Sequence, residues 1–249
     1  MEQIVVVLSL FSIGVLTSVI NIMVGGGSTL TLPILIFFGL DAPVANGTNR
    51  IGILSQSLFG MLSFRKEKVS QLKLSLKLGL LTLPGAIIGA IYSTKIENEL
   101  FEKMLGIVMI GIVFTMLVPN SKNYFKEKIL EKLPWLIYPT MFLLGFYGGF
   151  IQVGIGFLLM IALHHILKLN LVYVNLHKVV IVLIYTIPAL LIFILTNNIN
   201  WFYGISLASG NGLGAWWGAK LAVKKGEKII KIFLMAAILI MSTKLLGVF

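Results

Sequence analysis

The sequence of 249 residues contains no cysteine and very little charge. The absence of cysteine excludes disulfides and thiolate metal sites. Charged residues make up 12% of the chain, whereas about a quarter of the residues in a soluble domain are charged. Hydrophobic residues make up 58%, and the mean hydropathy is +1.00. This composition excludes an ordinary soluble domain and predicts an all-α polytopic membrane protein.

Acidic residues are the rarer charged class, with 9 Asp and Glu against 20 Lys and Arg and a net charge of +11. In a membrane protein such an excess collects in cytoplasmic loops and beside anionic headgroups. We therefore expect the lipid bilayer as a partner and no nucleic acid. The first residues are Met-Glu-Gln, and no small-residue cleavage site follows, so we expect the first apolar run to be retained.

Motifs for cofactor and metal chemistry are also missing from the sequence. It has no phosphate-binding nucleotide loop and no cluster of metal-ligating side chains. We therefore expect no cofactor, no metal and no enzymatic activity, and ATP hydrolysis would need a separate subunit.

Apolar runs dominate the rest of the chain, and most are near the ~20 residues that span a hydrocarbon core. Two shorter runs, 30–40 and 155–167, bring the expected number of segments to ten. The sequence leaves open whether these two cross the membrane or re-enter. The long runs are 4–24, 44–64, 74–92, 105–118, 135–151, 171–196, 201–219 and 232–249.

The two halves of the chain repeat each other. Gly26 pairs with Gly154 and Arg50 with Lys178 at an offset of 128 residues (154 − 26 and 178 − 50), and the offset falls to 125 later. The loop after the third segment is strongly basic in the first half and uncharged at 197–200, whereas after the fourth segment the second half is the basic one. Corresponding loops therefore lie on opposite sides of the membrane.

This pattern predicts two inverted repeats of about five segments each, at 1–119 and 134–249, joined by a cytoplasmic linker at 120–133. Inverted repeats are a common plan for secondary transporters. The sequence leaves the oligomeric state open, a homo-oligomer included.

The stretch GGGSTLTLP, residues 25–33, interrupts the first half. Three glycines weaken a helix, and Ser28 and Thr29 can cap a new helix from Leu30, whose positive end would face the break. The second copy spans 148–156, with Gln152 as its polar member. Unpaired backbone at membrane depth must face protein or a cavity, so we expect an interior binding role here. Glycines spaced four apart instead predict helix packing: Gly85, Gly89, Gly210 and Gly214.

The helix that follows each broken pair carries a cation a couple of turns from its start, in Asn49-Arg50 and in His177-Lys178. No acidic residue lies inside a long apolar run, so the sequence offers no internal counterion and predicts a site for an anion. The alternative is that each cation reaches the nearer headgroup layer. The pKa range of histidine suits His177 to proton coupling, and a structural histidine bound to a carbonyl is the alternative.

These motifs resemble the TauE/SafE family, the sulfite exporter or toluene sulfonate uptake permease group. The likeness lies in GGGSTLTLP, in Ala45-Asn-Gly-Thr-Asn49 and in the second copy, which has Gly154-Ile-Gly156 and His177-Lys178 where the family pattern differs. The resemblance implies a transporter of sulfite, sulfonates or similar small organosulfur anions in the cytoplasmic (inner) membrane of a bacterium, coupled to protons.

The resulting hypothesis is alternating access around a bound anion. A passive anion channel and an intramembrane hydrolase with Ser28 as nucleophile are the alternatives. The expected substrate-binding residues are Gly25, Gly26, Gly27, Ser28, Thr29, Asn49, Arg50, Gln152, Gly154, Gly156, His177 and Lys178, with His177 as the proton-coupling residue.

Overall fold

The structure is a computed structural model that describes residues 2–69, 71–117, 133–224 and 243–246. The expected linker, apart from residue 133, and most of the expected segment 232–249 lie outside the described residues. All regular elements of the described part are α-helices: α1 (Glu2–Val24), α2 (Ser28–Phe37), α3 (Ala42–Lys66), α4 (Leu72–Ser93), α5 (Asn98–Leu117), α6 (Ile137–Phe150), α7 (Ile155–Leu167), α8 (Leu171–Leu195) and α9 (Trp201–Lys224).

The surface of this helical bundle is apolar, as a bilayer requires. Three described helices contain stretches that are long and apolar enough to cross a membrane, at Gln3–Met23, Leu72–Ser93 and Leu171–Leu195. Large side chains such as Leu143 and Leu195 are exposed on the outside, whereas Asn49 and Arg50 of α3 are fully buried. Polar side chains are thus buried together with an apolar core, and large apolar side chains cover the outside, as in a membrane protein.

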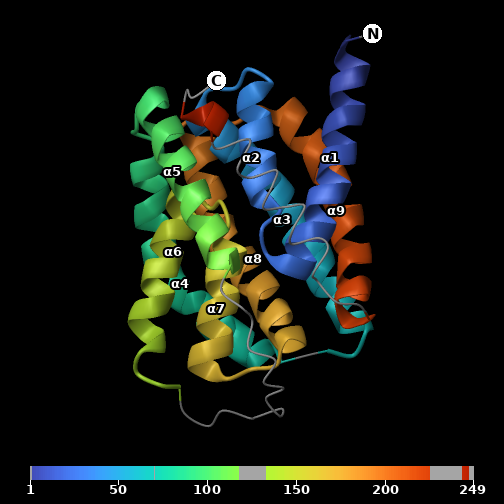
Figure 1. The fold of residues 1–249 in the computed structure, drawn as a ribbon, viewed down its shortest axis with the longest axis vertical. Helices are drawn as coiled ribbons and strands as arrows, with labels where there is room; N and C mark the ends of the chain where they lie inside the picture. The colour runs from blue at the N-terminus through green and yellow to red at the C-terminus, as the bar shows by residue number, and fades with distance from the viewer. Residues whose placement is uncertain (1, 70, 118–132, 225–242, 247–249) are drawn as a thin grey trace.

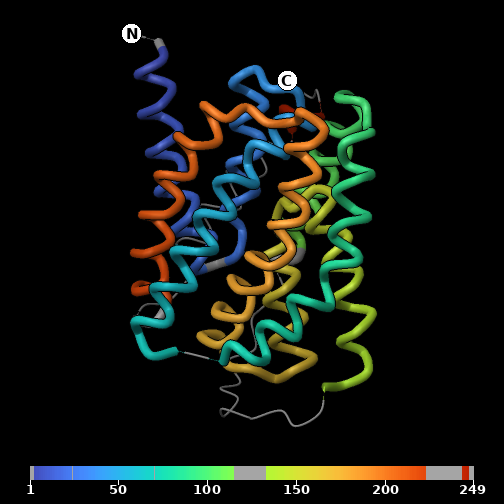
Figure 2. The backbone as a smooth tube through the Cα atoms, turned by 180° about the vertical axis from the view of Figure 1, so that it is seen from behind, coloured from blue at the N-terminus to red at the C-terminus, as the bar shows by residue number. Residues whose placement is uncertain are grey.

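The helices α2 and α7 are too short to cross a bilayer. They have 10 and 13 residues, or about 15 and 20 Å at 1.5 Å per residue, against a hydrocarbon core of ~30 Å. Figure 1 and, from behind, Figure 2 show α2 running back beside α1 toward the end where the chain starts. Likewise α7 turns back beside α6. The structure thus shows two helical hairpins, α1–α2 and α6–α7, in which each short helix doubles back beside the helix before it.

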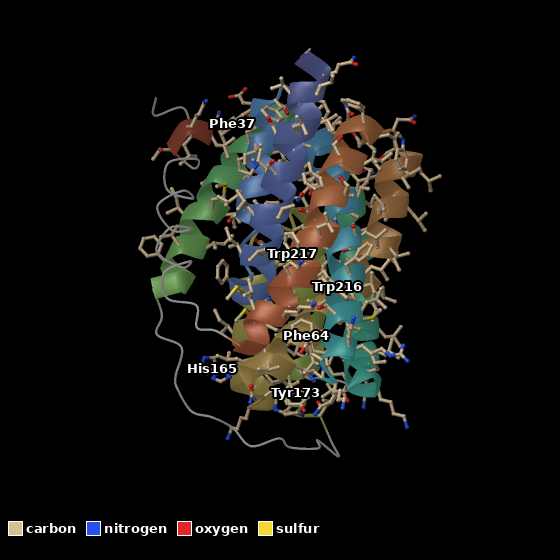
Figure 3. All side chains as sticks on the ribbon, turned by 90° about the vertical axis from the view of Figure 1, so that its right-hand side faces the viewer. Phe37, Phe64, His165, Tyr173, Trp216 and Trp217 are labelled. Carbon is tan, nitrogen blue, oxygen red and sulfur yellow. The ribbon has the colours of Figure 1, made fainter. Side chains whose placement is uncertain are left out.

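The two hairpins point in opposite directions. In Figure 3, Phe37 at the end of α2 lies near one end of the molecule, whereas His165 near the end of α7 and Tyr173 near the start of α8 lie near the other. Each hairpin therefore enters from its own end of the bundle, and the two tips meet inside it.

The fourth helix of each half packs against helices of the other half. Helix α9 lies against α1 and α3, and α4 lies against α6 and α8. Glycines make both contacts close: a Cβ on Gly89 would lie 2.1 Å from the carbonyl oxygen of Phe146, and one on Gly214 would lie 2.2 Å from that of Val15. Gly85 and Gly210 make the same backbone approaches one turn earlier. The predicted packing role of these four glycines is confirmed.

Replacement of these glycines by alanine tests the close helix contacts. We expect Gly89→Ala to destabilise the protein by about 1–3 kcal/mol, because the new methyl group overlaps the backbone of α6. Gly111→Ala is the matched control, since a Cβ there meets nothing within 4 Å and alanine favours a helix by roughly 1 kcal/mol. Thermal unfolding in detergent measures both, and equal Tm values for the two variants would contradict the packing role.

Candidate functional site

The glycine breaks of the two halves lie back to back at the hairpin tips. A Cβ on Gly156 would lie 2.2 Å from the carbonyl oxygen of Gly25, and a Cβ on Gly25 would lie 2.7 Å from the carbonyl carbon of Gly156. Gly25 also has φ +95°, a conformation that L side chains rarely adopt. The structure therefore brings the two predicted breaks together, and only glycine fits at this contact.

The start of α2 differs from the sequence-based expectation. The N-cap is Gly27, the helix already begins at Ser28, and no side chain caps it. The Thr29 hydroxyl instead donates to the Gly26 carbonyl, and Ser28 Oγ accepts a hydrogen bond from the Gly154 N–H at 3.2 Å. The predicted capping role of Ser28 and Thr29 is wrong, because their hydroxyls are used to fix the break and to join it to its counterpart.

Unbound backbone donors remain at this helix start. The N–H groups of Thr29 and Leu30 bind the carbonyls of Gly26 and Gly27, but in the described part of the chain those of Gly26, Gly27 and Ser28 bind no backbone carbonyl. A helix start with free N–H groups carries partial positive charge.

The second break contains two residues with a left-handed backbone conformation before α7. Gln152 has φ +65° and the N-cap Gly154 has φ +68°. Such a conformation costs a non-glycine residue of order 1 kcal/mol or more and persists where the surroundings impose it. It holds the Gln152 side chain in the interior, where Nε2 donates to Thr186 Oγ1 at 3.4 Å and Oε1 has no hydrogen-bond partner.

Lys178 of α8 binds the buried C-terminal end of α1. Its Nζ donates to the carbonyl oxygens of Asn21 at 2.9 Å and Ile22 at 3.1 Å, and to Asn175 Oδ1 at 2.7 Å. These carbonyls belong to the last turn of α1, where the helix supplies few further N–H donors, although the Asn21 carbonyl also accepts from the Gly25 N–H at 2.9 Å. Lys178 is 3% exposed, so it does not reach a headgroup layer.

Arg50 of α3 binds the buried end of α6 in the same way. Its Nη1 donates to the Gly148 carbonyl at 3.2 Å and its Nη2 to the Gly149 carbonyl. The guanidinium also lies 4.7 Å from the ring centroid of Phe193, a cation–π contact. Arg50 is completely buried, so the alternative of snorkelling is excluded for both cations.

The repeat relates these two interactions to each other. Asn21 and Gly149 are 128 residues apart (149 − 21), like Arg50 and Lys178, so each cation binds the equivalent carbonyl of the opposite half. A helix C-terminus carries roughly half a negative charge, which offsets part of each unit positive charge. The sequence predicted deep cations without internal partners, and the structure corrects this: helix ends are their partners.

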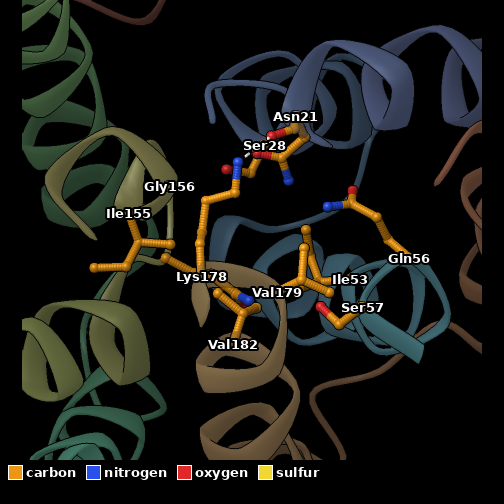
Figure 4. A pocket seen from close by; sticks show the side chains of 11 residues that line it. Asn21, Ser28, Ile53, Gln56, Ser57, Ile155, Gly156, Lys178, Val179 and Val182 are labelled. Carbon is orange, nitrogen blue, oxygen red and sulfur yellow. Dashed lines mark hydrogen bonds between the residues drawn. The ribbon is translucent and has the colours of Figure 1, made fainter. Parts of the chain in front are cut away.

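A small cavity lies where the hairpin tips meet Lys178 (Figure 4). Its volume is about 10 Å³, about the room for a single water molecule. The polar groups around it include Lys178 and no acidic residue. Its described lining consists of Asn21, Ser28, Ile53, Gln56, Ser57, Gln152, Ile155, Gly156, Lys178, Val179 and Val182.

The structure gathers only part of the predicted site around this cavity. Ser28, Gln152, Gly156 and Lys178 line it, while Gly25–Gly27, Thr29 and Gly154 form the adjoining breaks. Arg50 lies outside the lining, against α6. Asn49 is fully buried beside it, and both polar atoms of its side chain lack a hydrogen-bond partner.

His177 lies away from the cavity lining, although it is adjacent to Lys178 in the chain. Its Nδ1 is 2.7 Å from Ser75 Oγ of α4, and its Nε2 has no hydrogen-bond partner. The assignment of His177 to proton coupling stays a prediction.

The substrate-binding residues expected from the sequence did not include Asn21, Gln56 or Ser57, which line the cavity. The signal that could have found Ser57 is its spacing from Arg50, because seven residues along α3 complete about two turns and return to the same face. Asn21 had a weaker signal, because only its place just before the glycine triplet marks it.

Arg50→Lys tests the binding of the α6 end. The variant keeps the buried charge but cannot hold two carbonyls in the geometry of a guanidinium, so we expect a loss of about 1.5–3 kcal/mol of stability and a Tm lower by several degrees. Arg65→Lys, at an exposed position near the end of the same helix, is the control and should change stability by less than about 0.5 kcal/mol. Equal unfolding temperatures of the two variants would contradict this role of Arg50.

Comparison with known proteins places the chain in a family of membrane proteins. Residues 10–245 match the model of the family described as sulfite exporter TauE/SafE. A probable membrane transporter protein of Haemophilus influenzae is 27% identical over 237 residues, which cover 95% of this chain and 92% of that protein. The probable membrane transporter protein YfcA of Escherichia coli K12 is 28% identical, with 95% and 88% covered. YunE of Bacillus subtilis, also named a probable membrane transporter protein, is 24% identical, with 87% of each chain covered. No solved structure matches the chain significantly.

Proposed function

The chain belongs to the sulfite exporter TauE/SafE family, and we propose that it is a secondary transporter for a small organosulfur anion such as sulfite or a sulfonate. It would carry this anion across the cytoplasmic membrane of a bacterium by alternating access, coupled to protons. The relatives are bacterial proteins named probable membrane transporters, and the name of the family supports the sulfur oxyanion.

The observation that carries this proposal is the composition of the cavity at the hairpin tips. Lys178 supplies positive charge, and Asn21, Gln56, Gln152, Ser28 and Ser57 supply amide and hydroxyl donors. No acidic residue belongs to the described lining, so no side-chain carboxylate there repels an anion. Charge-assisted hydrogen bonds of this kind are the strong ones in oxyanion recognition.

Lys178 links anion binding to the position of a hairpin. Its Nζ is held by the end of α1, so an anion in the cavity competes with those two carbonyls for the same ammonium group. Binding would therefore weaken the attachment of α8 to the tip of the first hairpin. Arg50 would hold the tip of the second hairpin, and the free N–H groups at Gly26–Ser28 would face the anion with their partial positive charge.

The size of the cavity supports a conformational cycle. A space of about 10 Å³ holds a water molecule but no sulfur oxyanion. The anion can bind only if the two hairpin tips separate. Because the two hairpins enter from opposite ends of the bundle, movement of each tip would open the site toward a different end. The reciprocal packing of α4 and α9 supports the inverted repeat that such a cycle needs.

The two alternatives find less support. A passive channel needs a continuous path, whereas the tips at Gly25 and Gly156 are in direct contact. A hydrolase with Ser28 as nucleophile needs a base beside it, whereas Ser28 Oγ accepts from the Gly154 N–H and His177 contacts Ser75. His177 keeps a proposed role in proton coupling, because protonation next to Lys178 would change the charge of the site.

Transport in proteoliposomes tests the proposal. We expect uptake of radiolabelled sulfite to respond to an imposed pH gradient and to fall at least tenfold in Lys178→Gln, which loses the charge but keeps a polar side chain. Lys103→Gln, at a solvent-exposed lysine of α5, is the matched control and should transport normally.

Different results identify the alternatives. Sulfite flux that simply equilibrates and ignores the pH gradient would indicate a channel. Normal transport by Lys178→Gln would refute the assignment of the site, and absence of sulfite, sulfonate and thiosulfate transport by the folded protein would refute the substrate class.

A further inference from the structure

The two halves differ at a position that decides whether there is room beside the cation. Ser57 lines the cavity next to Lys178, and the residue 128 positions later is Tyr185 of α8 (185 − 57). Each follows the cation of its own helix by seven residues (57 − 50 and 185 − 178), so both return to the face on which that cation lies. The repeat therefore places an aromatic ring in one half where the other half has a hydroxymethyl group.

Tyr185 occupies the space beside Arg50. It is completely buried, and a Cβ on Gly148 would lie 2.8 Å from its Cζ and 2.9 Å from its hydroxyl oxygen. The carbonyl of the same Gly148 accepts the hydrogen bond from Arg50 Nη1. The tyrosine thus packs against the helix end that Arg50 binds, while the equivalent helix end at Asn21 opens into the cavity.

Tyr185 also adjoins one wall of the cavity. Its hydroxyl lies beside the Gln152 side chain, and Gln152 forms part of the cavity wall. The ring of Tyr185 therefore lies near Arg50 and behind one wall of the cavity.

We propose that Tyr185 makes the anion site one-sided. Its ring closes the repeat-related position beside Arg50, so that the chain binds a single anion beside Lys178 and Arg50 remains attached to α6. This inference rests on the proposed anion site and adds to it the residue that fixes the stoichiometry and the location of binding within the pseudo-symmetric centre.

Isothermal titration of the purified full-length protein with sulfite tests this proposal. We expect one sulfite per chain for the wild type and for Tyr185→Phe, which keeps the ring. Tyr185→Ser copies the first half into the second, and we expect it to bind two sulfite ions per chain. Adding Arg50→Gln to Tyr185→Ser should return the number to one, because the new site loses its cation.

Two sulfite ions per wild-type chain, or one per chain in a folded Tyr185→Ser variant, would overturn the proposal. If Tyr185→Ser does not fold, the reverse exchange decides: Ser57→Tyr should reduce sulfite affinity at least tenfold, and unchanged affinity would show that a tyrosine at this repeat position does not close a site. A folded wild-type protein that binds no sulfite at millimolar concentration would instead refute the proposed function.

Discussion

The buried ends of two helices are the constraint on which the rest of this structure depends. Helices α1 and α6 end at the hairpin tips, inside a protein that is surrounded by lipid, where their last carbonyl groups have no water to bind. Each unpaired group in such surroundings costs several kcal/mol. Lys178 and Arg50 donate hydrogen bonds to these ends, to Ile22 and Gly148 among others, and each does so from the opposite half of the chain.

This exchange of cations explains why the two halves hold together at their centre. A cation needs negative partners in a medium of low dielectric constant, and the carbonyl groups of a helix end need donors. Each cation therefore donates to a helix end, and the partial negative charge of that end stabilises the cation. The pairing is also incomplete, because a helix end carries only about half a charge. In the proposed function, the remaining positive charge, together with the N–H groups at the start of α2 that bind no carbonyl in the described part of the chain, favours an anion in the space between the tips. Ser57 leaves that space open on the side of Lys178, and Tyr185 fills it on the side of Arg50.

The sequence predicted the parts of this arrangement that depend on local pattern. Glycine spacing identified the helix contacts at Gly89 and Gly214, and the glycine triplet at 25–27 identified the break. The matched positions of Arg50 and Lys178 predicted that both would lie inside the protein. These features could be found because helix propensity, repeat offset and the cost of buried charge are all visible in a single chain.

The partners of these groups could not be predicted, because they depend on how distant segments meet. The carbonyls of Gly148 and Asn21 carry no side-chain signal, so nothing marked them as ligands of the cations. The same reason explains the error at Ser28, whose hydroxyl accepts from the Gly154 backbone and does not cap its own helix. The shortness of α2 and α7 was visible in the length of their apolar runs, yet those runs alone gave no direction for the chain after each break.

The central claim is that an anion binds between the hairpin tips beside Lys178, and the cysteine-free chain permits a direct measurement. Ser57→Cys places the only thiol in the cavity, while Ser55→Cys places it on the same helix toward α9, where Ser55 Oγ now binds the Ala208 carbonyl. The rate of modification by a small neutral thiosulfonate reagent is measured with and without sulfoacetate. We expect sulfoacetate to slow the modification of the thiol at position 57 and to leave the rate at position 55 unchanged. Equal rates at position 57 with and without the anion would contradict it.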